Sequence, residues 1–140
     1  MVNRLGFFVS GSIRHKDAIR EIFAAIEAEG HYITHDWTRT DDIGVKRENS
    51  VEAGLRAEAD INGVLRADVY VLDSSNESIG KFMYGELSVA IAAQQLGDGP
   101  QAIYIIGPLN HDSIVYYHPA VRRVDTIEEV LQEVATLQPV

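Results

Sequence analysis

Short apolar runs that alternate with segments of helical periodicity constrain the fold of this chain more than any other feature of its sequence. The runs Leu5–Val9 (LGFFV), Val69–Asp73 (VYVLD) and Ala102–Gly107 (AIYIIG) are almost continuously apolar. Strands with this pattern are buried on both faces, as in parallel sheets covered by helices on each side. Two further strands are expected at His31–Trp37 and near Val121–Val124.

Segments with the apolar spacing of amphipathic helices separate these strands. Such alternation is typical of a parallel sheet with helical crossover connections. We therefore expect one α/β domain over residues 1–140, a flavodoxin-like or Rossmann-like three-layer sandwich with a five-stranded parallel sheet and helices on both faces. The helices are expected at 16–29, at about 50–66, at 82–96 and from Thr126 onward.

Composition and charge exclude several classes of function. The chain has no cysteine, which rules out disulfides and thiolate metal sites, and no histidine belongs to a cluster with metal-ligand spacing. We therefore expect neither a metal nor a cofactor. The net charge is −9, and an acidic surface repels nucleic acid polymers. The first residues are too quickly polar for a signal peptide, and no apolar run approaches the roughly 20 residues that span a bilayer, so we expect a cytoplasmic protein without a membrane partner.

A ligand site is expected beyond the carboxyl ends of the strands, where the loops of an open parallel sheet meet. Within Phe82–Gly97 the one charged residue is Glu86, in the first turns of the helix that follows the third strand. Asp60 lies on or beside the apolar stripe of the preceding helix, a stripe that includes Val64 and Leu65. Burying a carboxylate is costly unless it is paired or hydrogen-bonded, and such groups cluster at functional sites.

Both carboxylates also have a structural interpretation. An acidic residue at a helix start is favoured by the helix dipole, and Asp60 could pair with Arg56 or Arg66 at the helix surface. The functional alternative is substitution at the anomeric carbon of a sugar. In that reaction one carboxylate forms a glycosyl ester and the other manages the proton of the leaving group.

Three motifs, FFVSGSIR, ADINGVLRADVYVLD and GKFMYGELSVAIA, follow one another within roughly residues 5–107. Their order and separation resemble the nucleoside 2-deoxyribosyltransferases and the related deoxynucleoside 5'-monophosphate N-glycosidases. The resemblance implies cleavage of the N-glycosidic bond of a 2'-deoxynucleoside through a glycosyl-glutamate intermediate, with transfer of deoxyribose to another nucleobase. It also implies a homodimer or higher oligomer with sites near the subunit interface.

Carried over residue by residue, the resemblance makes Glu86 the nucleophile and Asp60 the carboxylate that assists the base and the sugar. Members of the family often have a tyrosine on the first strand that touches the nucleophile, and this chain has Phe8 there. From their positions alone, Trp37 is a candidate to stack on a base and Met83 to line the pocket, although either could belong to the core. The resemblance adds Phe8, Gly11, Ser12, Ile13, Arg14, Ser78 and Gly80 around the sugar and its 5' group, and Asn110 to Ser113 at a neighbouring subunit's site.

Other functions remain open or are disfavoured. If water is the acceptor, the enzyme is a 5'-monophosphate N-glycosidase, and Arg14 is the residue that favours this alternative. A non-catalytic nucleotide sensor is the alternative from another class, and Phe8 in place of tyrosine supports it. A phospho-acceptor receiver domain would use Asp73, but the acidic residues after the first strand and the later lysine that it needs are missing. An FMN-binding protein lacks an aromatic loop to flank the flavin.

Overall fold

One parallel sheet organises the computed structural model, which describes residues 3–76, 80 and 82–139. The strand order is β2-β1-β3-β4-β5, and every neighbouring pair is parallel. The expected α/β fold with a five-stranded parallel sheet is confirmed. The strands are β1 (Gly6–Ser10), β2 (Tyr32–Ile33), β3 (Val69–Asp73), β4 (Ala102–Ile106) and β5 (Val121–Val124).

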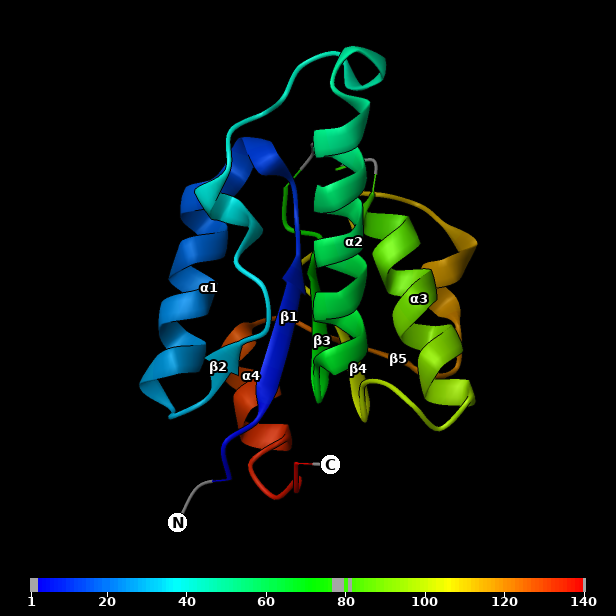
Figure 1. Ribbon diagram of the computed structural model, residues 1–140. Coiled ribbons are helices and arrows are strands. Elements are labelled where there is room, and N and C mark those ends of the chain that lie inside the picture. Colours follow the sequence, from blue (N-terminus) through cyan, green and yellow to red (C-terminus); the bar gives the residue numbers. More distant parts are fainter. Residues whose placement is uncertain (1–2, 77–79, 81, 140) are drawn as a thin grey trace.

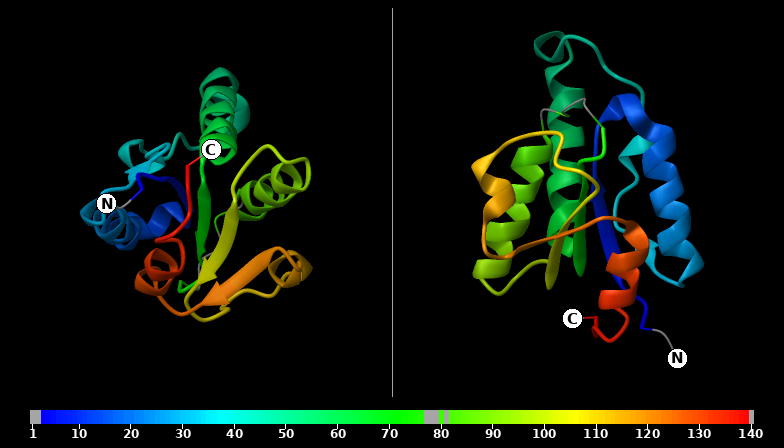
Figure 2. Two further views of the ribbon diagram at one scale, coloured as in Figure 1. Left: turned by 90° about the horizontal axis from the view of Figure 1, so that it is seen from below. Right: turned by 180° about the vertical axis from the view of Figure 1, so that it is seen from behind.

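Helices cover both faces of this sheet (Figures 1 and 2). One face carries α1 (Lys16–Ala28) and α4 (Ile127–Glu133), and the other carries α2 (Ser50–Arg66) and α3 (Met83–Gln95). Because side chains alternate along a strand, each buried strand supplies both apolar cores. Within the described residues, no helix is long and apolar enough to cross a membrane. Short 3-10 helices occupy the loops: η1 (Ile13–His15), η2 (Trp37–Arg39), η3 (Lys46–Glu48) and η4 (Ile114–Tyr117).

The second strand is much shorter than the expected His31–Trp37, because β2 ends at Ile33. The next residue, Thr34, still donates its amide to the Phe7 carbonyl, but its hydroxyl turns to the carbonyl of Gly63 on α2 at 2.7 Å. Two residues later Asp36 caps η2 by accepting from the Thr38 amide at 2.9 Å. Side chains that bond to nearby backbone compete with the strand ladder, so the chain leaves the sheet early.

Helix α2 extends beyond the carboxyl edge of the sheet, and its first half has no strand beneath it (Figure 1). Consequently its fully buried residues are only Gly63 and Val64 near its end. Leu65, which the apolar stripe places toward the core, is 42% exposed. The expectation that Leu65 faces the core is wrong, because only a narrow strip of the helix surface contacts the sheet. This overhang places the middle of α2 level with the strand ends, where a ligand site is expected.

Candidate functional site

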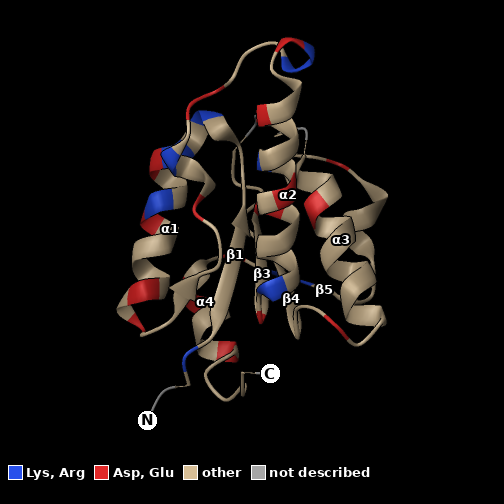
Figure 3. Cartoon of the chain, in the orientation of Figure 1, with Lys and Arg blue, Asp and Glu red and all other residues tan. Residues whose placement is uncertain are grey.

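Glu86 is a buried carboxyl at the carboxyl edge of the sheet. It lies in the first turn of α3, is 5% exposed, and is the one charged residue of that helix (Figure 3). Its Oε1 accepts a hydrogen bond of 2.8 Å from the Ser10 hydroxyl at the end of β1. Burial, and then the nearby charge of Asp60, raise the pKa of Glu86 from 4.5 to about 8, against the lowering effect of the Ser10 hydrogen bond. The group therefore holds a proton at neutral pH.

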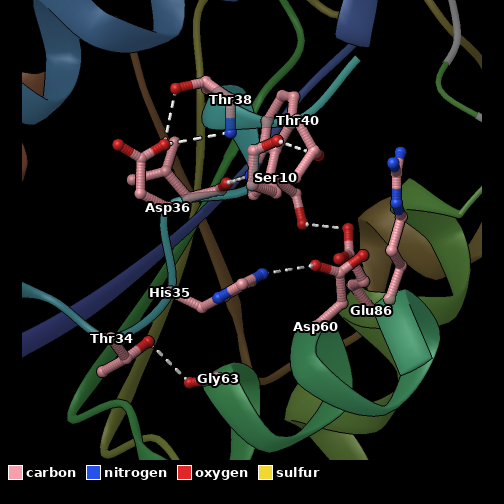
Figure 4. A network of polar contacts seen from close by, with 12 residues as sticks. Ser10, Thr34, His35, Asp36, Thr38, Thr40, Asp60, Gly63 and Glu86 are labelled. Atoms are coloured by element: carbon pink, nitrogen blue, oxygen red, sulfur yellow. Dashed lines mark hydrogen bonds and ion pairs between the residues drawn. The ribbon is translucent and has the colours of Figure 1, made fainter. Parts of the chain in front are cut away.

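Asp60 projects from α2 so that its carboxyl lies beside that of Glu86 (Figure 4). Its Oδ1 is 3.5 Å from Nε2 of His35, and its side chain is 20% exposed. Burial raises the pKa of Asp60, although the charges of His35 and Arg56 oppose the shift. The two carboxyls repel each other when both are ionised. The pair therefore keeps one proton at pH values at which two separate carboxyls would both be ionised.

The arginines considered as ion-pair partners of Asp60 have other contacts. Arg56 Nε donates to Glu52 at 3.0 Å, and Arg66 donates to the Thr34 carbonyl at 3.1 Å. Asp60 instead pairs with His35, which lies in the loop after β2.

A close contact between α2 and β1 sets the position of Asp60. Gly63 lies one turn after Asp60, and a Cβ atom there would be 2.8 Å from His35 Cβ and 2.9 Å from the Phe8 ring. Thr34 bonds to the Gly63 carbonyl and holds the same contact from the loop after β2 (Figure 4). The absence of a side chain at position 63 therefore lets α2 bring Asp60 near Glu86.

A second hydroxyl stands behind Ser10. Tyr70 lies on β3, is completely buried, and donates from its Oη to the Ser10 hydroxyl oxygen at 2.5 Å. Its backbone position pairs with Phe8 across the β1–β3 ladder, and the two rings stack with centroids 6.1 Å apart. Burial, followed by the charge of Glu86, raises the pKa of Tyr70 well above its ordinary value. Tyr70 therefore stays protonated and acts as a donor.

Phe8 and Met83, expected among the substrate-binding residues, lie beneath the site. Phe8 is 0% exposed and Met83 is 1% exposed, and both belong to the core between the sheet and helices α2 and α3. The sulfur of Met83 accepts from the Gly80 amide at 3.0 Å. Gly80 in turn lies against the turn after β1, since a Cβ there would be 3.0 Å from the Gly11 carbonyl oxygen. These two apolar side chains support the loops and do not form a pocket wall.

The turn after β1 presents the remaining expected residues at the start of α1. Ser12 is buried and caps η1 by accepting from the Arg14 amide at 3.3 Å. Ile13 and Arg14 are exposed and line, with Lys16, a surface hollow of about 310 Å³. This hollow lies at the start of α1, and neither Glu86 nor Asp60 is among its lining residues. Arg14 is thus available to a ligand that extends past the strand ends.

Trp37 packs against both apolar cores and donates its indole N–H to the Val9 carbonyl at 2.7 Å. It thereby anchors η2 over the end of β1. Asn110 donates to the Ser75 carbonyl at 2.7 Å, and Ser113 caps η4. Ser78 lies outside the described residues.

Ser10, Tyr70 and His35 were not predicted as site residues from the sequence, although weak indications of them exist. Ser10 is a hydroxyl at the end of an apolar run, and Tyr70 is the one polar side chain inside VYVL. A buried tyrosine usually finds a hydrogen-bond partner, so its position predicts a polar neighbour but not which one. His35 contacts Asp60 only because β2 ends early.

Comparison with known proteins bears on the fold. No protein-family model matches the chain, and no curated protein sequence matches it. Among solved structures, it is similar to the CMP N-glycosidase BcmB from Clostridium botulinum, with a TM-score of 0.58 and 12% sequence identity. The match covers 92% of this chain and 97% of that one. At this identity the similarity shows a shared fold.

Proposed function

We propose that this protein cleaves the N-glycosidic bond of a nucleotide or nucleoside, with Glu86 as the nucleophile and Asp60 as the acid and base. The observation that carries the proposal is the buried Glu86 carboxyl, held by a hydroxyl and placed beside a second carboxyl on α2. Two neighbouring carboxyls of unequal protonation are the groups that glycosidic substitution requires. The similarity of the fold to an N-glycosidase adds support.

In the first step the single proton of the pair passes from Glu86 to Asp60, which leaves Glu86 ionised. A Glu86 carboxylate oxygen attacks the anomeric carbon, and a carbon–oxygen ester bond forms as the carbon–nitrogen bond breaks. The electron pair of the broken bond goes to the base nitrogen, which takes the proton from Asp60. The products are a free base and a glycosyl-Glu86 ester, and Asp60 is left as a carboxylate.

In the second step Asp60 accepts a proton from the incoming acceptor, and the acceptor attacks the anomeric carbon. Glu86 leaves as a carboxylate, which returns the pair to its single-proton state. With water as the acceptor, the product is a free sugar or sugar phosphate. With a second nucleobase, the product is a new nucleoside.

Hydrolysis is our first candidate for the second step. The structural neighbour is an N-glycosidase of CMP, and Arg14 is exposed at the turn after β1, where it is available to a 5' phosphate. Base transfer, the 2-deoxyribosyltransferase activity that the three motifs imply, is the second candidate. The observation that favours it is the 5% exposure of Glu86, since a buried ester is shielded from water.

The test is to incubate the protein with CMP, dCMP and the corresponding nucleosides, with and without free adenine, and to separate the products by chromatography. Glu86→Gln should abolish base release because an amide cannot form the ester, whereas Glu58→Gln, an exposed change on α2, should have no effect. A 2'-fluorinated substrate analogue should add one glycosyl group to the peptide that contains Glu86, measured by mass spectrometry.

The products separate the candidates. Free base that forms with or without adenine identifies a hydrolase. A preference for monophosphates over nucleosides supports binding of the 5' phosphate by Arg14. A new nucleoside that forms only with adenine identifies a transferase. Nucleotide binding without turnover of any of these substrates contradicts the proposal and supports a sensor.

A further inference from the structure

Tyr70 is a buried titratable group that the proposed reaction does not use directly. It is 0% exposed and lies on the central strand of the sheet, below the surface that a substrate could reach. Its hydroxyl nevertheless bonds to Ser10, the side chain that donates to Glu86. The contacts form a directed series, in which Tyr70 Oη donates to Ser10 at 2.5 Å and Ser10 donates to Glu86 at 2.8 Å.

The direction of these bonds determines their effect. A hydroxyl that already accepts a hydrogen bond becomes a better donor, because hydrogen bonds in series polarise one another. Donation to a carboxylate favours its ionised form. Tyr70 cannot lose its own proton in the working pH range, since its pKa is raised well above the ordinary value by burial and by the charge of Glu86. These two hydrogen bonds therefore favour an ionised Glu86 and a protonated Asp60.

We infer that Tyr70 is a positioning residue that acts through Ser10, holding Glu86 in the orientation and ionisation state of a nucleophile. The inference rests on the proposed function for its catalytic consequence. Phe8, the residue that pairs with Tyr70 across the β1–β3 ladder, has no hydroxyl, so the tyrosine hydroxyl behind Ser10 comes from β3.

Other groups also act on Glu86 and enter the expected pH dependence. Asp60 approaches from α2 and opposes ionisation of Glu86, and His35 and Arg56 act on Asp60. Tyr70 and Ser10 approach from the sheet. Because Ser10 donates to Glu86 and Tyr70 donates to Ser10, removing the Tyr70 hydroxyl should favour the proton on Glu86 and leave the other contacts in place.

The decisive variant is Tyr70→Phe, which removes one hydroxyl from a buried ring. Its matched control is Tyr104→Phe on the neighbouring strand, where the hydroxyl donates to Glu133 at 3.1 Å and lies in the core on the other face of the sheet. The first measurement is the pKa of Glu86 by carbon-13 NMR of labelled glutamate, assigned with Glu86→Gln. We expect Tyr70→Phe to raise this pKa by about half a unit and Tyr104→Phe to leave it unchanged.

The second measurement is the pH profile of base release. We expect kcat to fall about tenfold in Tyr70→Phe with KM unchanged, and the alkaline limb of the profile to move to higher pH. Loss of structure would not move that limb upward. In a Ser10→Ala background, Tyr70→Phe should have no further effect, because the path from Tyr70 to Glu86 is already cut.

The outcomes distinguish the two proposals. If Tyr70→Phe raises the pKa of Glu86 but the natural protein has no N-glycosidic activity, the series of hydrogen bonds is supported and the proposed function is overturned. An unchanged pKa and an unchanged kcat in folded Tyr70→Phe overturn the inference. If Tyr70→Phe fails to fold, 3-fluorotyrosine at position 70 keeps the ring size and strengthens the donor. It should then lower the pKa of Glu86, and no change would again overturn the inference.

Discussion

Glu86 combines deep burial with a carboxyl neighbour, and both make its ionisation costly in the folded protein. In the unfolded chain the same side chain titrates near its ordinary 4.5, whereas in the folded protein it titrates near 8. Folding therefore takes up a proton between these two pH values. The stability contributed by the protonated group is present below pH 4.5 and is lost as the pH rises through about 8.

We expect Glu86→Gln to be more stable than the natural protein at pH 8, because glutamine has no charge to bury. The difference in the free energy of unfolding should be on the order of 4 kcal/mol at pH 8 and should fall to zero below pH 4.5. Urea unfolding across this range measures it, with exposed Glu58→Gln as the control. Parallel stability curves for Glu86→Gln and the natural protein would contradict the raised pKa.

Asp60 is expected to shape the pH dependence of the reaction. The active form of the pair holds one proton, so base release should decline as the pH rises through about 8. Asp60→Asn removes both the proton donor and the charge that raises the pKa of Glu86. We expect base release to fall about 10²–10⁴-fold and its remaining activity to rise with pH to a plateau. A descending limb that persists near pH 8 in this variant would contradict the assignment.

At the scale of elements, α2 has two different surroundings along its length. Its first half projects past the sheet, and its end packs closely on β1 through Gly63. Gly54 lies in the projecting half, and a Cβ atom there would meet nothing within 4 Å. Substituting alanine at each of these two positions therefore distinguishes the effect of helix propensity on stability from the effect of packing.

We expect Gly54→Ala to stabilise the protein by about 0.5–1 kcal/mol, since alanine is the better helix former. Gly63→Ala should instead destabilise it by about 1–2 kcal/mol, because the new methyl group meets the Phe8 ring and His35 Cβ. It should also lower kcat by moving Asp60 away from Glu86. Thermal unfolding and base-release assays measure both effects, and equal behaviour of the two variants would argue against the close contact.

At the scale of the whole molecule, the outer face of α2 is apolar at several positions. Val51 is 79% exposed, Leu55 is 60% exposed and Leu65 is 42% exposed. These residues recur along one side of the helix, on the side away from Asp60. The homodimer implied by the family resemblance stays a prediction, and this face is where we expect it to form.

The test of that prediction is Leu55→Glu, which places a charge within the apolar face. Sedimentation velocity should show a dimer for the natural protein and a monomer for Leu55→Glu, because burying an unpaired carboxylate is costly. Leu96→Glu, at the 83%-exposed end of α3, is the control and should leave the dimer intact. A monomeric natural protein would refute the expected oligomer.

Local sequence patterns predict the layered architecture, because continuous apolar runs separated by helical periodicity have few other solutions. Strand β3, the bounds of α2 and strand β5 follow from such patterns, and so does the placement of Glu86 at the carboxyl edge of the sheet. The contacts around the two carboxyls depend on long-range packing. The early end of β2 brings His35 to Asp60, Gly63 sets the approach of α2, and ladder register places Tyr70 behind Ser10. These contacts join residues far apart in the chain, and their distances depend on packing that no local pattern encodes.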